Sequence, residues 1–224
     1  MSTNRKIIFV NDYFYHVYNR GIEKRAVFTN RREFQRFIDT FTYYRFQTAK
    51  MRFSKYLVLP VEEKKKFLME VSKLNPLVDI VAFSLMSNHF HFILKQKIED
   101  GISKFISKTV NSYSKYFNTK HKREGPLFQG IFKAVWVETD EQLMHLSRYI
   151  HLNPYVSSLV KLGNLYSYKW SSLRDYLETN PFSFIQKESI LGLFKNRESY
   201  KKFVIDYASY AKELGKIKDL IIER

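Results

Sequence analysis

Two histidines stand one residue apart in the apolar stretch SNHFHFIL (87–94). Side chains of a β-strand alternate between the two faces of its sheet. Read as a strand, the stretch places His89 and His91 on one face and Phe90 and Phe92 on the other. Neutral imidazoles are common metal ligands, so the two rings can together bind one ion. By itself the pair is a weak signal, because strand histidines are more often held by hydrogen bonds.

A second set of candidates lies in the stretch RYIHLNP (148–154). Its surroundings predict a helix, and residues four apart lie on the same helical face, as Tyr149 and Asn153 do. Asn153 offers a carbonyl oxygen as a third metal ligand. Tyr149 offers a phenolic oxygen that can attack a phosphate polarised by a metal. Each residue alone is better explained as ordinary helix structure. If the helix packs on the histidine face, however, the four side chains form a site for phosphodiester chemistry.

Other residues are weaker candidates. His16 falls on a predicted strand and either lines the site or is satisfied by hydrogen bonds. His145 precedes Tyr149 by one helical turn and is an alternative base or ligand. His151 falls on another face of the helix, so we do not count it as a ligand. The tyrosines that compete with Tyr149 for the role of nucleophile are Tyr113, Tyr116 and Tyr155.

Hydrophobic periodicity and turn signals predict the elements that must hold these residues. Strands are predicted over 13–21, 77–86, 89–96 and 131–138, with a tight turn at Ser87-Asn88. The main helices are predicted over 30–50, 99–121 and 139–154. Asn30 caps the first, Thr139 or Asp140 caps the third, and Pro154 ends it. Shorter helices are predicted over 61–73, 170–178, 186–194 and 197–213.

The order of these elements is strand, helix, strand, strand, helix, strand, helix. It fits an α+β fold with a ferredoxin-like four-stranded antiparallel sheet that has two helices on one face. We predict this domain over residues 1–175, with 51–76 as an insertion. A helical C-terminal extension follows over 176–224.

The charge of the chain points to an anionic partner. It has 38 Lys and Arg against 22 Asp and Glu, a net charge of +16, and 17% aromatic residues. Cations neutralise phosphates and rings stack on unpaired bases, so nucleic acid is the favoured partner. No apolar stretch is long enough to span a bilayer, no basic amphipathic helix is flanked by membrane anchors, and no secretory signal or cysteine is present. We therefore expect a cytoplasmic protein with no membrane partner.

Four motifs in the chain together resemble a known family. They are YHVYNRG (15–21), NHFHFIL (88–94), GPLFQGIFKA (125–134) and RYIHLNP (148–154). Their combination is similar to the REP-associated tyrosine transposases, which belong to the single-tyrosine HUH transposases of insertion sequences. The resemblance covers about residues 12–175, and the segment 180–224 matches no motif of the family. The family pattern often has Arg where this chain has Ile131.

The resemblance implies an enzyme that cleaves and rejoins single-stranded or hairpin DNA with a divalent metal, Mg²⁺ or Mn²⁺. It implies a 5′-phosphotyrosine intermediate with a free 3′-hydroxyl, formed by a monomer or a homodimer. Tyr149 matches the nucleophile, and His89, His91 and Asn153 match the metal ligands. From their charge, ring or loop position we expect further DNA contacts at Arg20, Lys120, Lys122, Arg123, Phe128, Gln129 and Lys133.

Two other classes of function remain open. A ferredoxin-like sheet can bind single-stranded nucleic acid through exposed aromatic rings, without catalysis. The histidine pair with Tyr149 and Asn153 speaks against such a module, because stacking does not need those residues. The second alternative is a metal-dependent nuclease that uses water as the nucleophile, and trapping a covalent protein–DNA adduct distinguishes it from the transposase.

Overall fold

Four antiparallel strands form the centre of the computed structural model, which describes residues 7–47, 51–71, 73–177 and 182–213. The strands are β1 (Phe14–Arg20), β2 (Val78–Met86), β3 (His89–Gln96) and β4 (Lys133–Val137). Their order in the sheet is β2-β3-β1-β4, with antiparallel neighbours throughout. This is the ferredoxin-like arrangement, and it confirms the predicted fold class.

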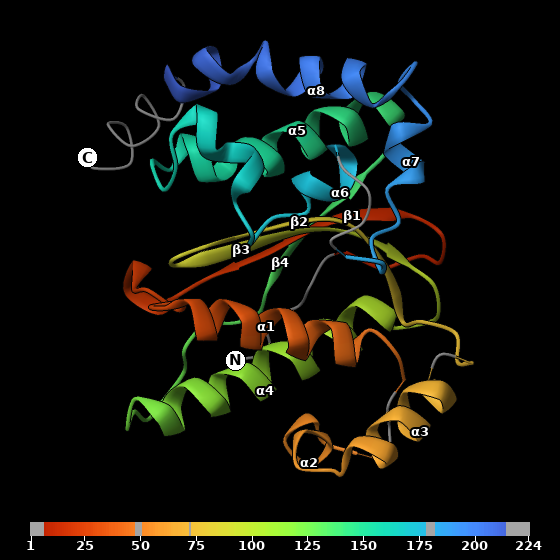
Figure 1. Cartoon of the computed structure of the whole chain (residues 1–224), viewed down its shortest axis with the longest axis vertical. Coiled ribbons are helices and arrows are strands. Elements are labelled where there is room, and N and C mark those ends of the chain that lie inside the picture. Colours follow the sequence, from red (N-terminus) through yellow and green to blue (C-terminus); the bar gives the residue numbers. More distant parts are fainter. Residues whose placement is uncertain (1–6, 48–50, 72, 178–181, 214–224) are drawn as a thin grey trace.

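Helices cover both faces of the sheet (Figure 1). On one face lie α1 (Arg31–Tyr44) and α4 (Gly101–Lys120), and on the other lie α5 (Asp140–Val156) and, beyond it, α8 (Arg197–Ile205). The shorter elements are η1 (Ile22–Lys24), α2 (Phe53–Leu57), α3 (Val61–Val71), η2 (Leu162–Ser167), α6 (Leu173–Leu177) and α7 (Glu188–Leu191). Within the ranges given above, no helix combines the length and the apolarity that crossing a membrane requires.

The predicted alternation of β3 is confirmed. Phe90 and Phe92 are fully buried, and their rings lie 5.2 Å from those of Phe37 and Phe41 of α1, respectively. His91 is on the opposite face, where its ring meets α5. The sheet therefore carries its apolar core on the α1–α4 side and its imidazoles on the α5 side.

Two helix caps are confirmed. The Asn30 side chain accepts a hydrogen bond from the Glu33 amide at the start of α1, and the Thr139 hydroxyl accepts one from the Gln142 amide at the start of α5. The predicted end of the first helix at residue 50 is wrong. The helix ends at Tyr44, because the next carbonyl, that of Arg45, accepts a hydrogen bond from Leu77 at 2.7 Å as the chain approaches β2. Residues 48–50 lie outside the described residues.

The predicted end of α5 at Pro154 is also wrong, because the helix continues to Val156. Proline lacks only its own amide hydrogen, so the amides that follow it can still donate into the helix. The amide of Ser157, for example, donates to the carbonyl of Asn153 at 2.8 Å. Asn153 therefore lies within the last turn of α5 and not at its edge.

The helices predicted over 170–178 and 186–194 are shorter in the structure, as α6 and α7, whereas the stretch predicted over 197–213 is helical except for a turn at 206–207. Residues 169–172, just before α6, form a turn with one bridge to β2: the Leu85 amide donates to the Trp170 carbonyl at 2.8 Å, and the Ser172 amide donates to that of Phe83 at 3.0 Å. This part of the chain still joins the main hydrophobic core, in which Tyr200 and Val204 of α8 are fully buried together with Ile150 of α5. The segment after residue 175 thus packs directly on the helix that carries Tyr149.

Candidate active site

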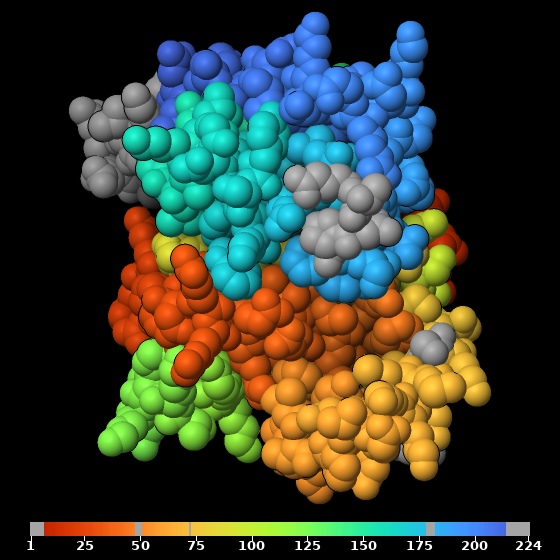
Figure 2. Space-filling model, viewed as in Figure 1, coloured from red at the N-terminus to blue at the C-terminus, as the bar shows by residue number. Residues whose placement is uncertain are grey.

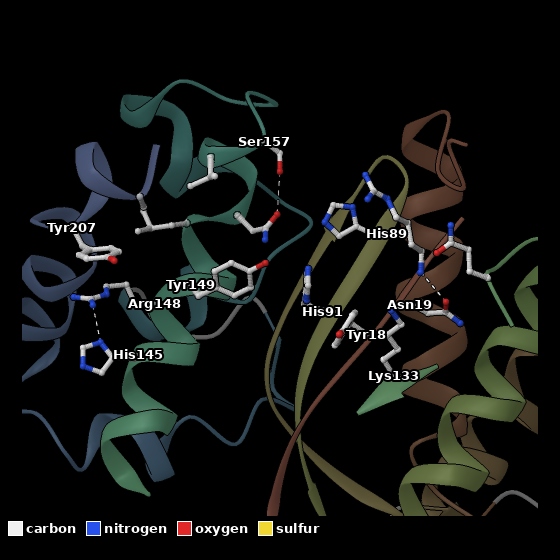
Figure 3. A pocket seen from close by; sticks show the side chains of 16 residues that line it. Tyr18, Asn19, His89, His91, Lys133, His145, Arg148, Tyr149, Ser157 and Tyr207 are labelled. Carbon is white, nitrogen blue, oxygen red and sulfur yellow. Dashed lines mark hydrogen bonds between the residues drawn. The ribbon is translucent and has the colours of Figure 1, made fainter. Parts of the chain in front are cut away.

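α5 lies across the imidazole face of the sheet and brings Tyr149 next to His91 (Figure 3). The ring centres of these two residues are 5.5 Å apart, and those of His89 and His91 are 5.1 Å apart. Asn153, one turn after Tyr149, is 5% exposed and lines the same hollow. The structure therefore brings together the four residues that the sequence singled out.

The hollow has a volume of about 720 Å³ and a positive lining. Arg20, Lys133 and Arg148 contribute cations, and none of the described residues that line it is Asp or Glu. Its full lining is Tyr18, Asn19, Arg20, His89, His91, Gln129, Lys133, His145, Arg148, Tyr149, Leu152, Asn153, Val156, Ser157, Tyr207 and Ala211. A cleft with this charge suits a phosphate-containing ligand.

Both histidines of β3 use the same ring nitrogen for a protein partner. His89 Nδ1 is hydrogen-bonded to the side-chain Oδ1 of Asn88, which can only accept, so Nδ1 carries the proton. His91 Nδ1 lies 2.8 Å from His16 Nε2, with the two rings stacked. If His91 is the donor in that bond, both β3 histidines keep the Nε2 lone pair for another ligand.

Burial keeps these rings neutral. It lowers the pKa of His16 to about 4, and burial together with the charge of Arg20 lowers the pKa of His89 to about 4. Burial, helped by the neighbouring His16 and His89, holds the pKa of His91 well below its usual value. Neutral imidazole is the form that binds a metal ion.

Asn153 links the two halves of the site. Its Oδ1 accepts a hydrogen bond from Ser157 Oγ at 3.1 Å. Its amide also interacts with His89, where it partly opposes the fall in pKa, and with Tyr149. Burial raises the pKa of Tyr149, and the Asn153 hydrogen bond offsets only part of that rise. The phenol is therefore protonated at neutral pH and must lose its proton when it attacks.

The donor set fits a divalent cation. Two neutral imidazoles and one amide oxygen make a mixed nitrogen and oxygen site. The described part of the chain contains no group of three or more His, Cys, Asp or Glu residues that could hold a metal ion. His89, His91 and Asn153 are the residues that could hold one here.

The expected DNA contacts divide into three groups. Arg20, Gln129 and Lys133 line the hollow. Lys120, Lys122 and Arg123 lie at the end of α4, where Lys120 binds Glu33 at 2.7 Å and Arg123 binds Asn118 at 2.7 Å. Phe128 is 4% exposed and packs on Phe90 in the core. Because its ring is not on the surface, we do not retain Phe128 as a DNA contact.

The other histidines have separate partners. His151 is fully buried between Tyr200 and Ser172, at 2.6 and 2.9 Å, which agrees with its exclusion as a ligand. His145 lines the far side of the hollow and binds Arg148 at 2.7 Å (Figure 3).

Among the competing tyrosines, Tyr113 is fully buried and donates to the Val27 carbonyl. Tyr113 and Tyr116 belong to α4, on the opposite face of the sheet.

Several residues of the hollow were not identified from the sequence, among them Tyr18, Arg148 and Tyr207. Tyr18 pairs with His91 across the β1–β3 ladder, and their rings lie 5.5 Å apart. Tyr18 lies two residues after His16, so strand alternation places both on the same face of the sheet. The sequence does not give the register of β1 with β3, which brings Tyr18 beside His91. Arg148 lies between the rings of Phe203 and Tyr207, at 4.2 and 3.9 Å. No local sequence pattern predicts that Tyr207 lines a site built by β3 and α5.

Comparison with known proteins gives the class of the molecule. Residues 9–153 match the model of the family described as "Transposase IS200 like", which is well over half of the chain. The chain belongs to the IS200-like transposases, a family of enzymes that act on DNA. A search of curated proteins finds no match.

One solved structure shows the fold that this chain shares, and a second match is weaker. The first is described as a REP-associated tyrosine transposase bound to a REP hairpin. It is 15% identical, the match covers 78% of this chain and 84% of that chain, and the TM-score is 0.51. The tRNA(His) guanylyltransferase from Saccharomyces cerevisiae is 13% identical, with 94% and 79% covered, and its TM-score of 0.36 is too low to bear on function.

Proposed function

We propose that the chain is a single-tyrosine transposase of the REP-associated kind, which cleaves and rejoins single-stranded or hairpin DNA. The observation that supports this most is the meeting of Tyr149, His91, His89 and Asn153 in one positively lined hollow. A protein that only binds single-stranded nucleic acid by stacking on its bases does not need this combination of side chains. All four side chains come from one chain, so a monomer contains a full site.

Tyr149 is the nucleophile in this proposal. Its Oη forms a bond to the scissile phosphorus while the bond from phosphorus to the 3′-oxygen of the preceding nucleotide breaks. The 5′-phosphate stays on Tyr149, and the departing strand ends in a 3′-hydroxyl after it takes up a proton. The phenol proton passes to water, since burial raises the pKa of Tyr149 and leaves it protonated at the start. Attack by the 3′-hydroxyl of another strand reverses the step and joins the strands.

A divalent metal, Mg²⁺ or Mn²⁺, held by His89, His91 and Asn153 would polarise the scissile phosphate. Arg20, Lys133 and Arg148 would bind the neighbouring phosphates, because they are the cations that line the hollow. Arg20 pairs with His89 across the β1–β3 ladder, so a phosphate bound by this arginine lies beside the proposed metal ligands.

The direct test is incubation with labelled DNA taken from the flanks of the gene. With Mg²⁺ or Mn²⁺, denaturing gels should show cleavage of single-stranded and hairpin DNA. Perfect duplex should stay intact, because a strand held in a duplex cannot easily bend into the Tyr149 site. Cleavage that persists in a chelator would contradict the metal role. Tight binding without cleavage under any metal would favour the non-catalytic module.

A further inference from the structure

A second tyrosine, Tyr18 of β1, lines the same hollow as Tyr149 and has no part in the chemistry described so far. Its ring stacks on those of His16 and His91, with ring centres 4.9 and 5.5 Å apart. Tyr149 meets the same two imidazoles edge-on, at 6.3 and 5.5 Å. The two phenols therefore flank one pair of imidazoles, Tyr18 from the sheet and Tyr149 from α5.

The position of Tyr18 follows from the register of the sheet. Tyr18 is directly opposite His91 of β3 on one side and Lys133 of β4 on the other. Side chains of directly opposite residues lie on the same face of an antiparallel sheet. Lys133, Tyr18 and His91 therefore form a row across the face that carries the hollow. Figure 3 shows Tyr149 and Tyr18 on opposite sides of His91.

The hydroxyl of Tyr18 is available to a ligand. In the space-filling view the layer of α5 (teal) lies directly against the N-terminal part of the chain (red and orange), and little of β2 and β3 (yellow) is visible between them (Figure 2). Tyr18 is half-buried beneath this layer, yet within the described part of the chain its hydroxyl makes no hydrogen bond. By contrast, Tyr168 and Tyr176 donate to main-chain carbonyls at 2.6 and 2.9 Å. Groups this sheltered are normally hydrogen-bonded, so a free hydroxyl in a cleft points to a ligand.

The proposed reaction needs a proton donor on this side of the hollow. Tyr149 Oη attacks phosphorus in line, so the bond to the 3′-oxygen breaks on the side away from Tyr149. Without a proton the departing oxygen would carry a full negative charge. A general acid in such a position accelerates the step by about 10²–10⁴-fold. A phenol can fill this role, because it holds its proton less tightly than a sugar hydroxyl does.

Other groups of the lining are less suited to give this proton. No carboxylate is among the described residues of the hollow. His145 lies on the far side and is bonded to Arg148 at 2.7 Å. His16 Nε2 and His91 Nδ1 are bonded to each other at 2.8 Å. Lys133 is the remaining competitor, and its exposed ammonium is better suited to hold a phosphate of the departing strand.

We propose that Tyr18 is the general acid of strand cleavage and donates its hydroxyl proton to the departing 3′-oxygen. As Tyr149 Oη bonds to phosphorus, the bond from phosphorus to the 3′-oxygen breaks, that oxygen takes the proton, and Tyr18 remains as a phenolate. In strand joining the phenolate takes the proton back from the attacking 3′-hydroxyl. This inference rests on the proposed function, since it assigns one step of that reaction.

The first test is Tyr18→Phe, which keeps the stacked ring and removes the proton. Single-turnover cleavage of a single-stranded oligonucleotide should slow by at least about 100-fold. DNA affinity by fluorescence anisotropy and Mn²⁺ affinity by calorimetry should not change, and circular dichroism checks the fold. The matched control is Tyr13→Phe, the same change just before β1 at a residue that is 47% exposed and packs on Trp136. The control should cleave at the wild-type rate.

A second substrate separates proton donation from every other role of Tyr18. It carries sulfur in place of the scissile 3′-oxygen, and a thiolate can depart without taking up a proton because thiols are much stronger acids than alcohols. Tyr18→Phe should cleave this substrate at the wild-type rate. Lys133→Ala should weaken DNA binding, and sulfur should not restore its cleavage.

Three results would overturn the inference. They are an unchanged rate of Tyr18→Phe on the normal substrate, an equal loss on both substrates, and a loss in Lys133→Ala that sulfur restores. If wild type forms the Tyr149 adduct while any of these is seen, the proposed function stands and only the role of Tyr18 falls. If wild type cleaves neither substrate, both fall.

Discussion

His89 and His91 each use Nδ1 for a protein partner, which is Asn88 Oδ1 for His89 and His16 Nε2 for His91. Alternation along β3 made the proximity of the two rings predictable, since it put them on one face. The partners that fix the rings were not predictable. His16 is 75 residues away from His91 and reaches it only through the register of β1 with β3.

Loss of either β3 histidine should abolish metal binding and cleavage. His89→Ala or His91→Ala leaves one strong ligand, which is too few to hold the ion. Asn153→Ala should have a milder effect, because a water molecule can replace one amide oxygen. Titration calorimetry with Mn²⁺ and gel cleavage assays measure both effects, and circular dichroism checks the fold. Wild-type cleavage by either histidine variant would exclude the metal role.

His16 should act on the metal through His91. His16→Ala removes the hydrogen-bond partner of His91 Nδ1, and losing such a partner typically weakens metal affinity by about 10–100-fold. His16→Gln places a carbonyl oxygen near the same atom and should restore much of the affinity. Calorimetry with Mn²⁺ distinguishes these outcomes without any cleavage assay. Equal affinities in wild type and His16→Ala would show that the contact does not orient the ring.

α5 carries both Tyr149 and Asn153, and it is held in place by α8 on one side and, through Ser172, by β2. His151 bonds to Tyr200 of α8 at 2.6 Å and to Ser172 at 2.9 Å, and Ser172 in turn bonds to the backbone of β2. Lys212 donates to the carbonyls of Tyr155 and Val156, where a cation also suits the helix dipole. Periodicity predicted α5 and its cap, but these anchors come from long-range contacts that no local pattern contains.

Removing one hydroxyl from this anchor should loosen α5. Tyr200→Phe keeps the ring but leaves His151 Nδ1 and Ser147 Oγ without their partner in a buried site. Such a loss costs about 1–3 kcal/mol, which lowers Tm by several degrees in a chain of this size. Cleavage should slow as well, since Tyr149 is two residues from both His151 and Ser147 on α5. Tyr210→Phe, at a position 54% exposed, is the control and should leave Tm unchanged. An unchanged Tm in Tyr200→Phe would show that the anchor is dispensable.

The molecule as a whole combines a positive surface with neutral, buried imidazoles. Composition predicted the anionic partner, but it could not predict how the cations divide between the two faces of the sheet. Some, such as Lys133, line the Tyr149 hollow, while Lys108 and Lys115 lie on the opposite side. The burial of His151, with a pKa lowered to about 3, follows equally from packing between distant segments.

Stability should fall as the solution becomes acidic. The folded pKa values of His16 and His89 are about 4 and that of His151 about 3, below the usual value of 6.5. Between pH 6.5 and 4 the unfolded chain therefore binds more protons, and each histidine contributes a slope of up to about 1.4 kcal/mol per pH unit. Asp175, whose pKa burial raises to about 6, opposes them in part, because its folded form takes up a proton first.

Urea unfolding in the presence of a chelator measures this dependence. The free energy of unfolding should decrease from pH 7 to pH 5 in wild type, and His151→Gln should decrease less steeply because it lacks one of the titrating groups. A free energy that stays constant over this range would contradict the neutral, buried state of the imidazoles.

The proposed chemistry depends on Tyr149 as the nucleophile, and one measurement tests this role most directly. The protein is incubated with metal and single-stranded DNA, the covalent adduct is trapped and digested, and mass spectrometry locates the attached nucleotide. The attachment should be on Tyr149, and Tyr149→Phe should fold, bind DNA and metal, and form no adduct. A nucleotide on Tyr18, whose ring is also 5.5 Å from His91, or on any other tyrosine would contradict the assignment. Continued cleavage by Tyr149→Phe without an adduct would instead identify water as the nucleophile.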